Sequence, residues 1–212
     1  MPQECLILLM RKNNEIGSKE YVVGIDEVGR GPLAGPVTIC ACKIAKNFDQ
    51  RFFKGIKDSK QLSARKREEW FLKISDLKQK GELDFAFSSV SASEIDSKGI
   101  VLAIRKAMKK SLATLKLDPS TTRIMLDGSL KAPAEFIMQE TIIKGDEKIP
   151  VISAASIIAK VMRDRYMEDQ ARVYPGYDLE NNKGYGTDKH LKGIRRLGIT
   201  PIHRFTFLSR IL

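Results

Sequence analysis

The chain has 212 residues, of which 42% are hydrophobic, enough for one large domain with a substantial core. Lys and Arg total 37 against 26 Asp and Glu, so the formal net charge is +11, which favours a nucleic acid or an anionic membrane surface as partner. No apolar run reaches the roughly 18 residues of a membrane-spanning helix, so a spanning protein is not expected.

Residues 1–20 are predicted to form an N-terminal lead-in to the fold. The apolar patch Cys5–Met10 is too short to span a membrane, its charges follow it, and no small-residue cleavage site comes after it, so we do not expect a signal peptide. Cys5, Cys40 and Cys42 lack the spacing of metal ligands. Reduced, buried thiols in a cytoplasmic protein are therefore expected, with Cys40 and Cys42 on one face of a strand.

The first two predicted strands flank a glycine-rich turn. Tyr21–Asp26 reads as a buried strand, and the adjacent carboxylates Asp26 and Glu27 stand at its end. The turn contains Arg30, and a second strand is predicted over Pro36–Ile44. A tight Gly-Pro turn between the two strands predicts an antiparallel pair.

The middle of the chain alternates between helix and strand. Ser63 predicts the start of a helix that runs to about Gln79, and Glu82–Val90 alternates like a third strand. Ser91 and Glu94 have capping-box spacing and predict one further helix. Its apolar stripe indicates core packing and comprises Val101, Ile104, Met108, Leu112 and Leu115.

Two more strands and two more helices are predicted in the second half. The strands are Thr122–Leu126 and Glu140–Ile143, and a helix is predicted from Ser153 to about Gln170. A last helix from Asp188 to Leu197 ends at Gly198. This order predicts an α/β sheet with a C-terminal helical extension.

Four carboxylates stand out by their positions: Asp26, Glu27, Asp127 and Asp164. The first three lie at the ends of predicted strands, where α/β sheets build their sites, whereas Asp164 lies in the middle of a predicted helix. Hard oxygen ligands of this kind suit Mg²⁺ or Mn²⁺. Two such ions about 4 Å apart activate a water and steady the leaving oxygen in phosphodiester cleavage.

Each carboxylate also has an ordinary alternative interpretation. Asp127 precedes Gly128, and an Asp-Gly pair after a strand is most often a turn. Asp164 stands between two arginines and would ordinarily be a solvated helix charge. The pair Asp26-Glu27 alone is compatible with a simple strand-end turn.

Several sequence blocks resemble type 2 ribonuclease H, in particular bacterial ribonuclease HII. The blocks occur in the family's order between residue 21 and about residue 207 and are Gly24–Pro36, Asp58–Ser63, Leu126–Gly128, Ala154–Arg165, Tyr174–Tyr177, Lys183–Thr187 and Pro201–Arg204. One departure is Asn182, which stands where many relatives have a histidine.

The resemblance implies a ribonuclease H-like fold, a mixed five-stranded sheet flanked by helices. It implies a catalytic metal-binding quartet of Asp26, Glu27, Asp127 and Asp164 that uses Mg²⁺ or Mn²⁺. It further implies substrate-binding roles for Gly29, Arg30, Gly31, Lys60 and Tyr185. The glycine-flanked loop would contact ribose 2′-hydroxyls, Lys60 would hold phosphate, and Tyr185 would pack on the next deoxyribose. Without the resemblance, Lys60 would be interpreted as solvated and Tyr185 as an ordinary packing aromatic.

We therefore expect an endoribonuclease that acts on RNA–DNA hybrids and on single ribonucleotides embedded in duplex DNA. Cleavage would leave a 3′-hydroxyl and a 5′-phosphate. The expected domains are a catalytic domain over residues 21–172 and a C-terminal helical extension over residues 173–212 that contributes to substrate binding. We expect a cytoplasmic monomer with no membrane partner.

Three alternatives compete with this expectation. Ribonuclease HIII has similar blocks, but Arg30 between two glycines and the absence of a long N-terminal substrate-binding domain favour ribonuclease HII. A catalytically idle nucleic-acid-binding module would have lost a carboxylate, and none of the four is lost. A structural or partner-binding protein would function without metal.

Overall fold

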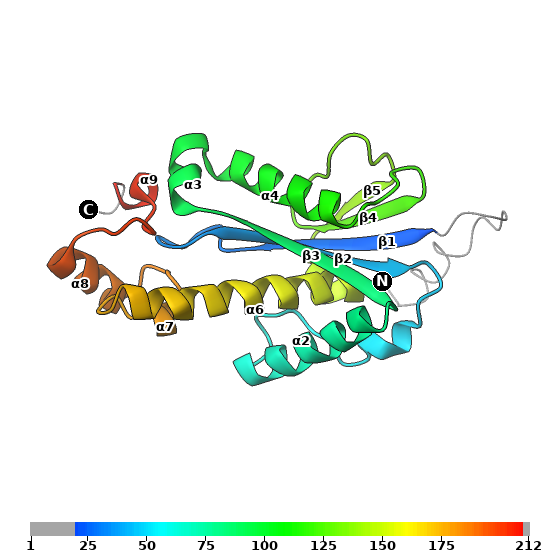
Figure 1. The fold of residues 1–212 in the computed structure, drawn as a ribbon, viewed down its shortest axis with the longest axis horizontal. Helices are drawn as coiled ribbons and strands as arrows, with labels where there is room; N and C mark the ends of the chain where they lie inside the picture. Colours follow the sequence, from blue (N-terminus) through cyan, green and yellow to red (C-terminus); the bar gives the residue numbers. More distant parts are fainter. Residues whose placement is uncertain (1–19, 210–212) are drawn as a thin grey trace.

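A five-stranded mixed sheet forms the centre of the structure, a computed structural model that describes residues 20–209 (Figure 1). The strands are β1 (Tyr21–Val28), β2 (Val37–Ala45), β3 (Leu83–Val90), β4 (Thr122–Asp127) and β5 (Gln139–Ile142). Their spatial order is β3-β2-β1-β4-β5. Strand β2 pairs antiparallel with β1 and β3, whereas β4 pairs parallel with β1 and β5. The predicted mixed α/β sheet is confirmed.

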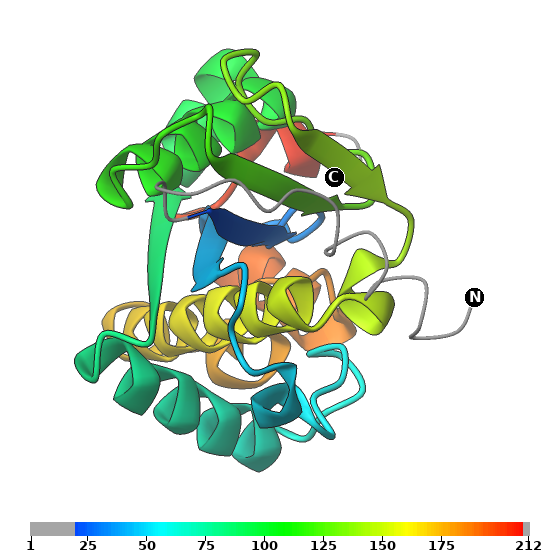
Figure 2. The ribbon, with the colours of Figure 1, turned by 90° about the vertical axis from the view of Figure 1, so that its right-hand side faces the viewer.

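Helices cover both faces of this sheet (Figures 1 and 2). Helix α4 (Ile100–Thr114) lies on one face and α6 (Pro150–Val173) on the other, with α2 (Ala64–Gln79) packed against α6. Successive strand residues point to opposite faces, so β1 contributes Val23 and Ile25 to the core under α4 and Val22 to the core under α6.

The remaining helices are short, and most of them lie toward the C-terminus. They are η1 (Gln50–Phe53), α3 (Ala92–Lys98), α5 (Gly145–Lys148), α7 (Leu179–Asn182), α8 (Asp188–Leu197) and α9 (Phe205–Leu208). Helices α8 and α9 both lie at the same end of the molecule, with α9 near α3 (Figure 1). Among residues 20–209, no helix is long and apolar enough to cross a membrane.

Several predicted helix boundaries match the structure. Helix α2 begins after Ser63, whose hydroxyl oxygen accepts a hydrogen bond from the backbone N–H of Lys66 at 3.3 Å. Helix α8 begins after Thr187, which caps the N–H of His190, and ends at Gly198, whose φ is +81°. Such a φ is easily adopted only by glycine.

Two predicted helices differ from the structure. The single helix expected after Ser91 is two helices, because Gly99 at φ +80° ends α3 before α4 begins. Helix α6 starts at Pro150 rather than at Ser153, since proline fits the first helical turn. The hydroxyl of Ser153 donates to the carbonyl of Asp146 instead of capping the helix.

Strand β1 is two residues longer than predicted. Its pairing with β2 continues to Val28, so Asp26 and Glu27 lie within the strand and not in a turn. Cys40 and Cys42 are buried, free and in one core cluster, as predicted, whereas Cys5 lies outside the described residues. The lead-in and the boundary between the catalytic domain and the extension stay predictions.

Candidate active site

Asp26 and Asp127 lie side by side at the carboxyl ends of two parallel strands. The register pairs Ile25 of β1 with Leu126 of β4, so the next residue of each strand is one of the two aspartates. The backbone pairing of β1 with β4 extends only to this point, which leaves both carboxylates at the edge where parallel strands commonly form a site.

Asp26 is buried against helix α6. Its carboxylate accepts the N–H of Glu27 at 2.7 Å, and the hydroxyl of Ser156 acts to lower its pKa. The hydroxyl of Ser156 in turn lies 2.8 Å from that of Ser59. Burial, followed by the charges of Glu27 and Asp127, raises the pKa of Asp26 well above its usual value.

Glu27 has an oxygen without a partner. Its Oε2 is buried and accepts no hydrogen bond within residues 20–209, while Oε1 lies 3.7 Å from the Arg30 guanidinium. Burial raises the pKa of Glu27, and the charge of Arg30 only partly opposes the shift. A buried carboxylate oxygen with no partner is costly unless something binds it.

Asp127 is oriented by the start of helix α5. Its Oδ1 accepts the backbone N–H of Gly145 at 2.7 Å. A side-chain carbon at position 145 would lie 2.8 Å from Ile152 and 3.5 Å from the same Asp127 oxygen, so glycine permits this close approach.

A fifth carboxylate, Asp146, lies beside Asp127 and was missed in the sequence. Its side chain is buried, and burial, together with the charges of Asp127 and Asp58, raises its pKa to about 6. The ammonium of Lys60 lies 3.8 Å from its Oδ2. The sequence contained the same kind of signal for Asp146 as for Asp127. Asp127 ends β4, and Asp146 follows the end of the next strand, β5.

Asp164, on helix α6, is held by two cations. Its Oδ1 accepts from the ammonium of Lys160 at 2.7 Å, and its Oδ2 lies 3.8 Å from the Arg67 guanidinium. The same Arg67 donates to the carbonyls of Ser59 and Leu62. Through Arg67, Asp164 is thus connected to the loop that carries Lys60.

The residues present fit a divalent cation. As the side chains lie, residues 20–209 hold no group of three or more His, Cys, Asp or Glu close enough to grip a metal. Yet the charge of Asp127 acts on three other carboxylates and raises the pKa of each, and Oε2 of Glu27 is buried without a partner. The four carboxylates are Asp26, Glu27, Asp127 and Asp146. Such a set of hard oxygen donors is matched by Mg²⁺ or Mn²⁺ with waters completing the shell.

Two buried arginines hold the glycine-rich loop against the rest of the chain. Arg163 donates to the carbonyls of Ala34, Pro36 and Lys183, and Arg204 donates to those of Gly29, Arg30 and Gly35. The loop also bonds directly to the Tyr185 segment, since the N–H groups of Leu33 and Ala34 both donate to the Gly184 carbonyl. The predicted substrate-binding loops are thus adjacent.

A pair of buried histidines positions Tyr185, whose own side chain is 46% exposed. The N–H of Thr200 donates to Nδ1 of His203, so the proton of His203 must sit on Nε2. That nitrogen lies 3.1 Å from Nε2 of His190, whose Nδ1 in turn lies 2.8 Å from the Tyr185 carbonyl. Burial lowers both pKa values, that of His203 to about 4, so both rings are neutral at pH 7.

Asn182 is a structural residue in this region. Its amide donates to the Tyr177 carbonyl at 2.7 Å and its oxygen accepts the N–H of Gly184 at 2.8 Å. The departure from the histidine of many relatives therefore leaves the turn before Tyr185 fully bonded.

The raised pKa of Asp146 predicts a pH-dependent stability of the metal-free protein. In an unfolded chain this carboxyl titrates near about 3.9, so the folded form binds the proton more tightly and gains stability as pH falls through about 6. In chelator, the melting temperature of the parent should rise relative to that of Asp146→Asn between pH 7.5 and 5. Calorimetry checks this, and parallel curves for the two proteins would contradict it.

The sheet and the carboxylate positions define the class. A mixed five-stranded sheet of this order, with acidic residues at the ends of its central parallel strands, is the ribonuclease H-like α/β fold. The solved structure of ribonuclease H2 from Pyrococcus horikoshii OT3 is similar with a TM-score of 0.69 and 29% identity. The similarity covers 90% of this chain and 96% of that chain.

The chain belongs to the ribonuclease HII family. The family's sequence profile matches residues 23–210. Ribonuclease HII of Shouchella clausii is 45% identical over 94% of this chain and 73% of that protein, and ribonuclease HII of Clostridium beijerinckii is 41% identical over 94% and 72%. The chain is accordingly an enzyme of the family that hydrolyses the RNA of RNA–DNA hybrids and depends on divalent metal ions.

Proposed function

We propose that this enzyme also incises duplex DNA on the 5′ side of a single embedded ribonucleotide, using two divalent ions, Mg²⁺ or Mn²⁺. Incision would leave a 3′-hydroxyl and a 5′-phosphate. The observation that supports this is the contact between the carboxylate cluster and the glycine-rich loop: Glu27 lies 3.7 Å from the guanidinium of Arg30, and Arg30 and Gly31 are exposed. That loop is the part of the site that can approach a ribose closely.

In this proposal, Asp26, Glu27, Asp127 and Asp146 hold the ions. Bound there, the ions would lower the pKa of a water and neutralise charge on the scissile phosphate. The hydrogen bonds from the N–H of Glu27 to Asp26 and from the N–H of Gly145 to Asp127 orient the ligands. We infer that Asp146 takes the place assigned to Asp164 from the sequence.

Lys60 is proposed to contact phosphate. Its side chain is 80% exposed, although its ammonium lies 3.8 Å from Asp146. Burial of part of the chain lowers its pKa, but the charges of Asp58 and Asp146 outweigh this and keep the pKa above its usual value. A permanent cation at the rim of an acidic cluster can attract a phosphate that the carboxylates alone would repel.

Tyr185 is proposed to pack on the deoxyribose that follows the ribonucleotide, because its exposed ring lies in the loop bonded to Leu33 and Ala34.

A duplex with one ribonucleotide, analysed on a sequencing gel, tests this together with the proposed incision. The parent should yield a single cut on the 5′ side, and Tyr185→Ala should lose about tenfold in rate on this substrate, as for lost stacking on one residue. Tyr185→Phe should be milder. Equal cutting by parent and Tyr185→Ala would return Tyr185 to a packing role, and no cut by the parent would remove the incision activity.

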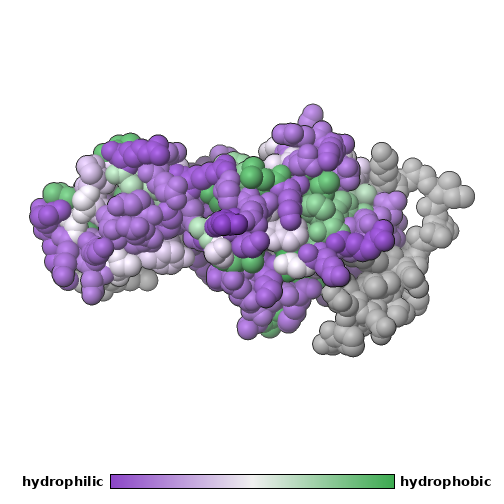
Figure 3. All heavy atoms as spheres, turned by 90° about the horizontal axis from the view of Figure 1, so that it is seen from below, coloured by the Kyte–Doolittle hydropathy of each residue, from purple (hydrophilic) through white to green (hydrophobic). Residues whose placement is uncertain are grey.

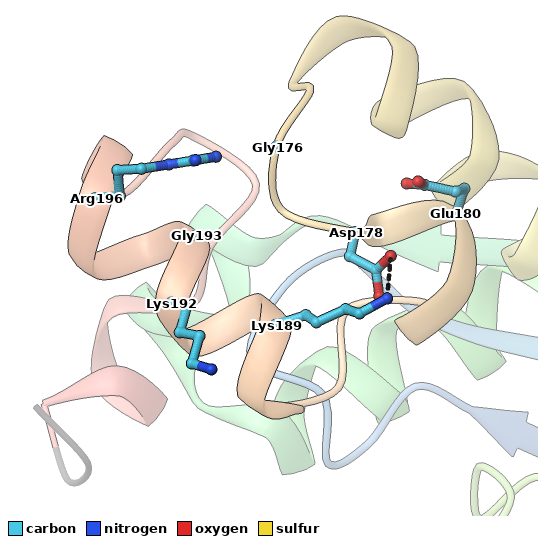
Figure 4. Close-up of a pocket in the computed structure, with 7 residues that line it drawn as sticks. All are labelled: Gly176, Asp178, Glu180, Lys189, Lys192, Gly193 and Arg196. Atoms are coloured by element: carbon cyan, nitrogen blue, oxygen red, sulfur yellow. Dashed lines mark ion pairs between the residues drawn. The ribbon is translucent and has the colours of Figure 1, made fainter.

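The C-terminal extension is proposed to contact the duplex backbone. Lys189, Lys192 and Arg196 project from α8 around an open hollow of about 370 Å³, where Lys189 lies 3.9 Å from Asp178 (Figure 4). The hollow contains none of the four carboxylates, so we assign it to phosphate contact and not to chemistry. The face over α2 and α6 is also largely hydrophilic (Figure 3). We further propose that the enzyme acts as a monomer in the cytoplasm, with nucleic acid and not a membrane as its partner.

Phosphate contacts predict a steep dependence of affinity on salt. Binding to a hybrid duplex, measured by fluorescence anisotropy in chelator, should weaken at least about 100-fold between roughly 50 and 200 mM salt, because bound phosphates release counterions. The melting temperature measured at both salt concentrations serves as a control for folding. A flat affinity over this range would contradict the electrostatic part of the proposal.

A further inference from the structure

The guanidinium of Arg204 is a buried charge that forms no ion pair within residues 20–209, although the charge of Asp96 acts on it. The side chain has 0% exposure, and no carboxylate within residues 20–209 lies within 4 Å of it. Burial and the charge of Arg163 lower its pKa to about 9, so it stays protonated at neutral pH. A buried cation is costly unless its donors are satisfied, and here backbone carbonyls satisfy them.

Arg204 makes three hydrogen bonds, all to the glycine-rich loop. Nη2 donates to the carbonyl of Gly29 at 2.6 Å, Nη1 to that of Arg30 at 3.0 Å, and Nε to that of Gly35 at 3.0 Å. The backbone fixes the same contact, since the N–H of Arg204 donates to the Leu33 carbonyl at 2.8 Å. Arg163 holds other carbonyls of the loop, but not those of Gly29 and Arg30.

This contact determines which way two peptide groups point. Every described peptide bond is trans, and in a trans peptide the C=O and the following N–H point in opposite directions. Because Arg204 draws the carbonyls of Gly29 and Arg30 inward, the N–H groups of Arg30 and Gly31 face outward. Both residues are exposed, and within residues 20–209 neither N–H donates to a protein acceptor.

Gly31 leaves this donor pair open. Its φ is not positive, and a side-chain carbon added there would meet no atom within 4 Å. In contrast, a carbon added at Gly29 would lie 2.3 Å from Nε of Arg163. Packing and conformation therefore explain Gly29 but not Gly31, whose missing side chain gives a ligand access to the N–H groups.

We propose that Arg204 is the positioning residue for ribose recognition: it holds the N–H groups of Arg30 and Gly31 outward as a fixed donor pair for the 2′-oxygen of the substrate. The inference rests on the proposed function of the loop. Arg204 touches no substrate atom and acts only through the two carbonyls.

The test compares affinity for two duplexes of one sequence, all-DNA and with one ribonucleotide, by anisotropy in chelator. Arg204→Lys keeps the charge, but an ammonium lacks the rigid, planar set of N–H donors with which the guanidinium holds three carbonyls. The preference for the ribonucleotide duplex should fall about fivefold, the range of one or two lost hydrogen bonds, while all-DNA affinity stays unchanged. Leu208→Ala is the control for a general loosening of the C-terminal segment. It removes a buried side chain of α9 that forms no hydrogen bond to the loop, so the preference for the ribonucleotide duplex should remain.

The outcomes separate this inference from the proposed function. If the unsubstituted protein showed no preference for the ribonucleotide duplex, the proposed function itself would be contradicted. A parent with a preference that folded Arg204→Lys retains would overturn the role of Arg204 alone. If the buried lysine prevents folding, Arg204→Gln, which is neutral and keeps one donor amide, takes its place with the same expected loss.

Discussion

Replacing Asp127 by Asn should nearly abolish hydrolysis of RNA–DNA hybrids while leaving the fold intact. Asp127 lies between Asp26 and Asp146, and its charge raises the pKa of both. An amide is a poor ligand for a hard cation, and loss of even an outer-shell partner costs about 10- to 100-fold, so loss of a direct ligand should exceed 100-fold. Removal of a repelling charge should also leave the metal-free protein no less stable.

Steady-state cleavage of a labelled hybrid in Mg²⁺ checks this prediction. Asp169→Asn is the matched control, because Asp169 is an exposed carboxylate on α6 that pairs with Arg172 and, in the described part of the chain, with no other cation. The control should retain full turnover. Undiminished turnover in Asp127→Asn would remove this carboxylate from the mechanism.

The second prediction decides between Asp146 and Asp164 as the fourth carboxylate of the site. Asp146→Asn should lower turnover by more than about 100-fold, for the reason given for Asp127. Asp164→Asn should instead lower the free energy of unfolding by about 1–3 kcal/mol, since Lys160 and Arg67 lose a partly buried partner. The turnover of Asp164→Asn should fall less than that of Asp146→Asn, because the only expected effect on the site is a displacement of Lys60 by the loosened loop.

Turnover, metal affinity and unfolding measured on both variants distinguish the two residues. If Asp164→Asn lost turnover and Mn²⁺ affinity while Asp146→Asn kept both, the original sequence assignment would be restored. Lys160→Gln offers a further comparison, because it breaks the ion pair with Asp164 from the other side and should resemble Asp164→Asn.

The strand-end argument predicted part of the site from the sequence. Asp26 and Asp127 were found because apolar strands precede both, and the parallel pairing of β1 with β4 brings them together. Asp146 was missed because the argument was not carried to β5, and because a Gly-Asp pair after a short strand resembles a turn. Asp164 was predicted as a ligand from the resemblance, whereas in the structure it forms an ion pair with Lys160, four residues earlier in the helix.

Other features depend on long-range contacts that periodicity does not show. Arg204 would be placed on the surface from its type, and its burial follows only from the approach of the C-terminal segment to Gly29 and Gly35. The break at Gly99 was hidden because the residues before and after it both continue a helical pattern. The general α/β order was predictable because strands and helices here carry clear local signals.

The position of the metal is tested most directly by anomalous diffraction from crystals of the protein soaked in Mn²⁺. We predict anomalous density among the carboxylates of Asp26, Glu27, Asp127 and Asp146, with the unpartnered oxygen of Glu27 turned toward it. Density at Asp164, between Lys160 and Arg67, or no density at the ends of β1 and β4, would contradict the account.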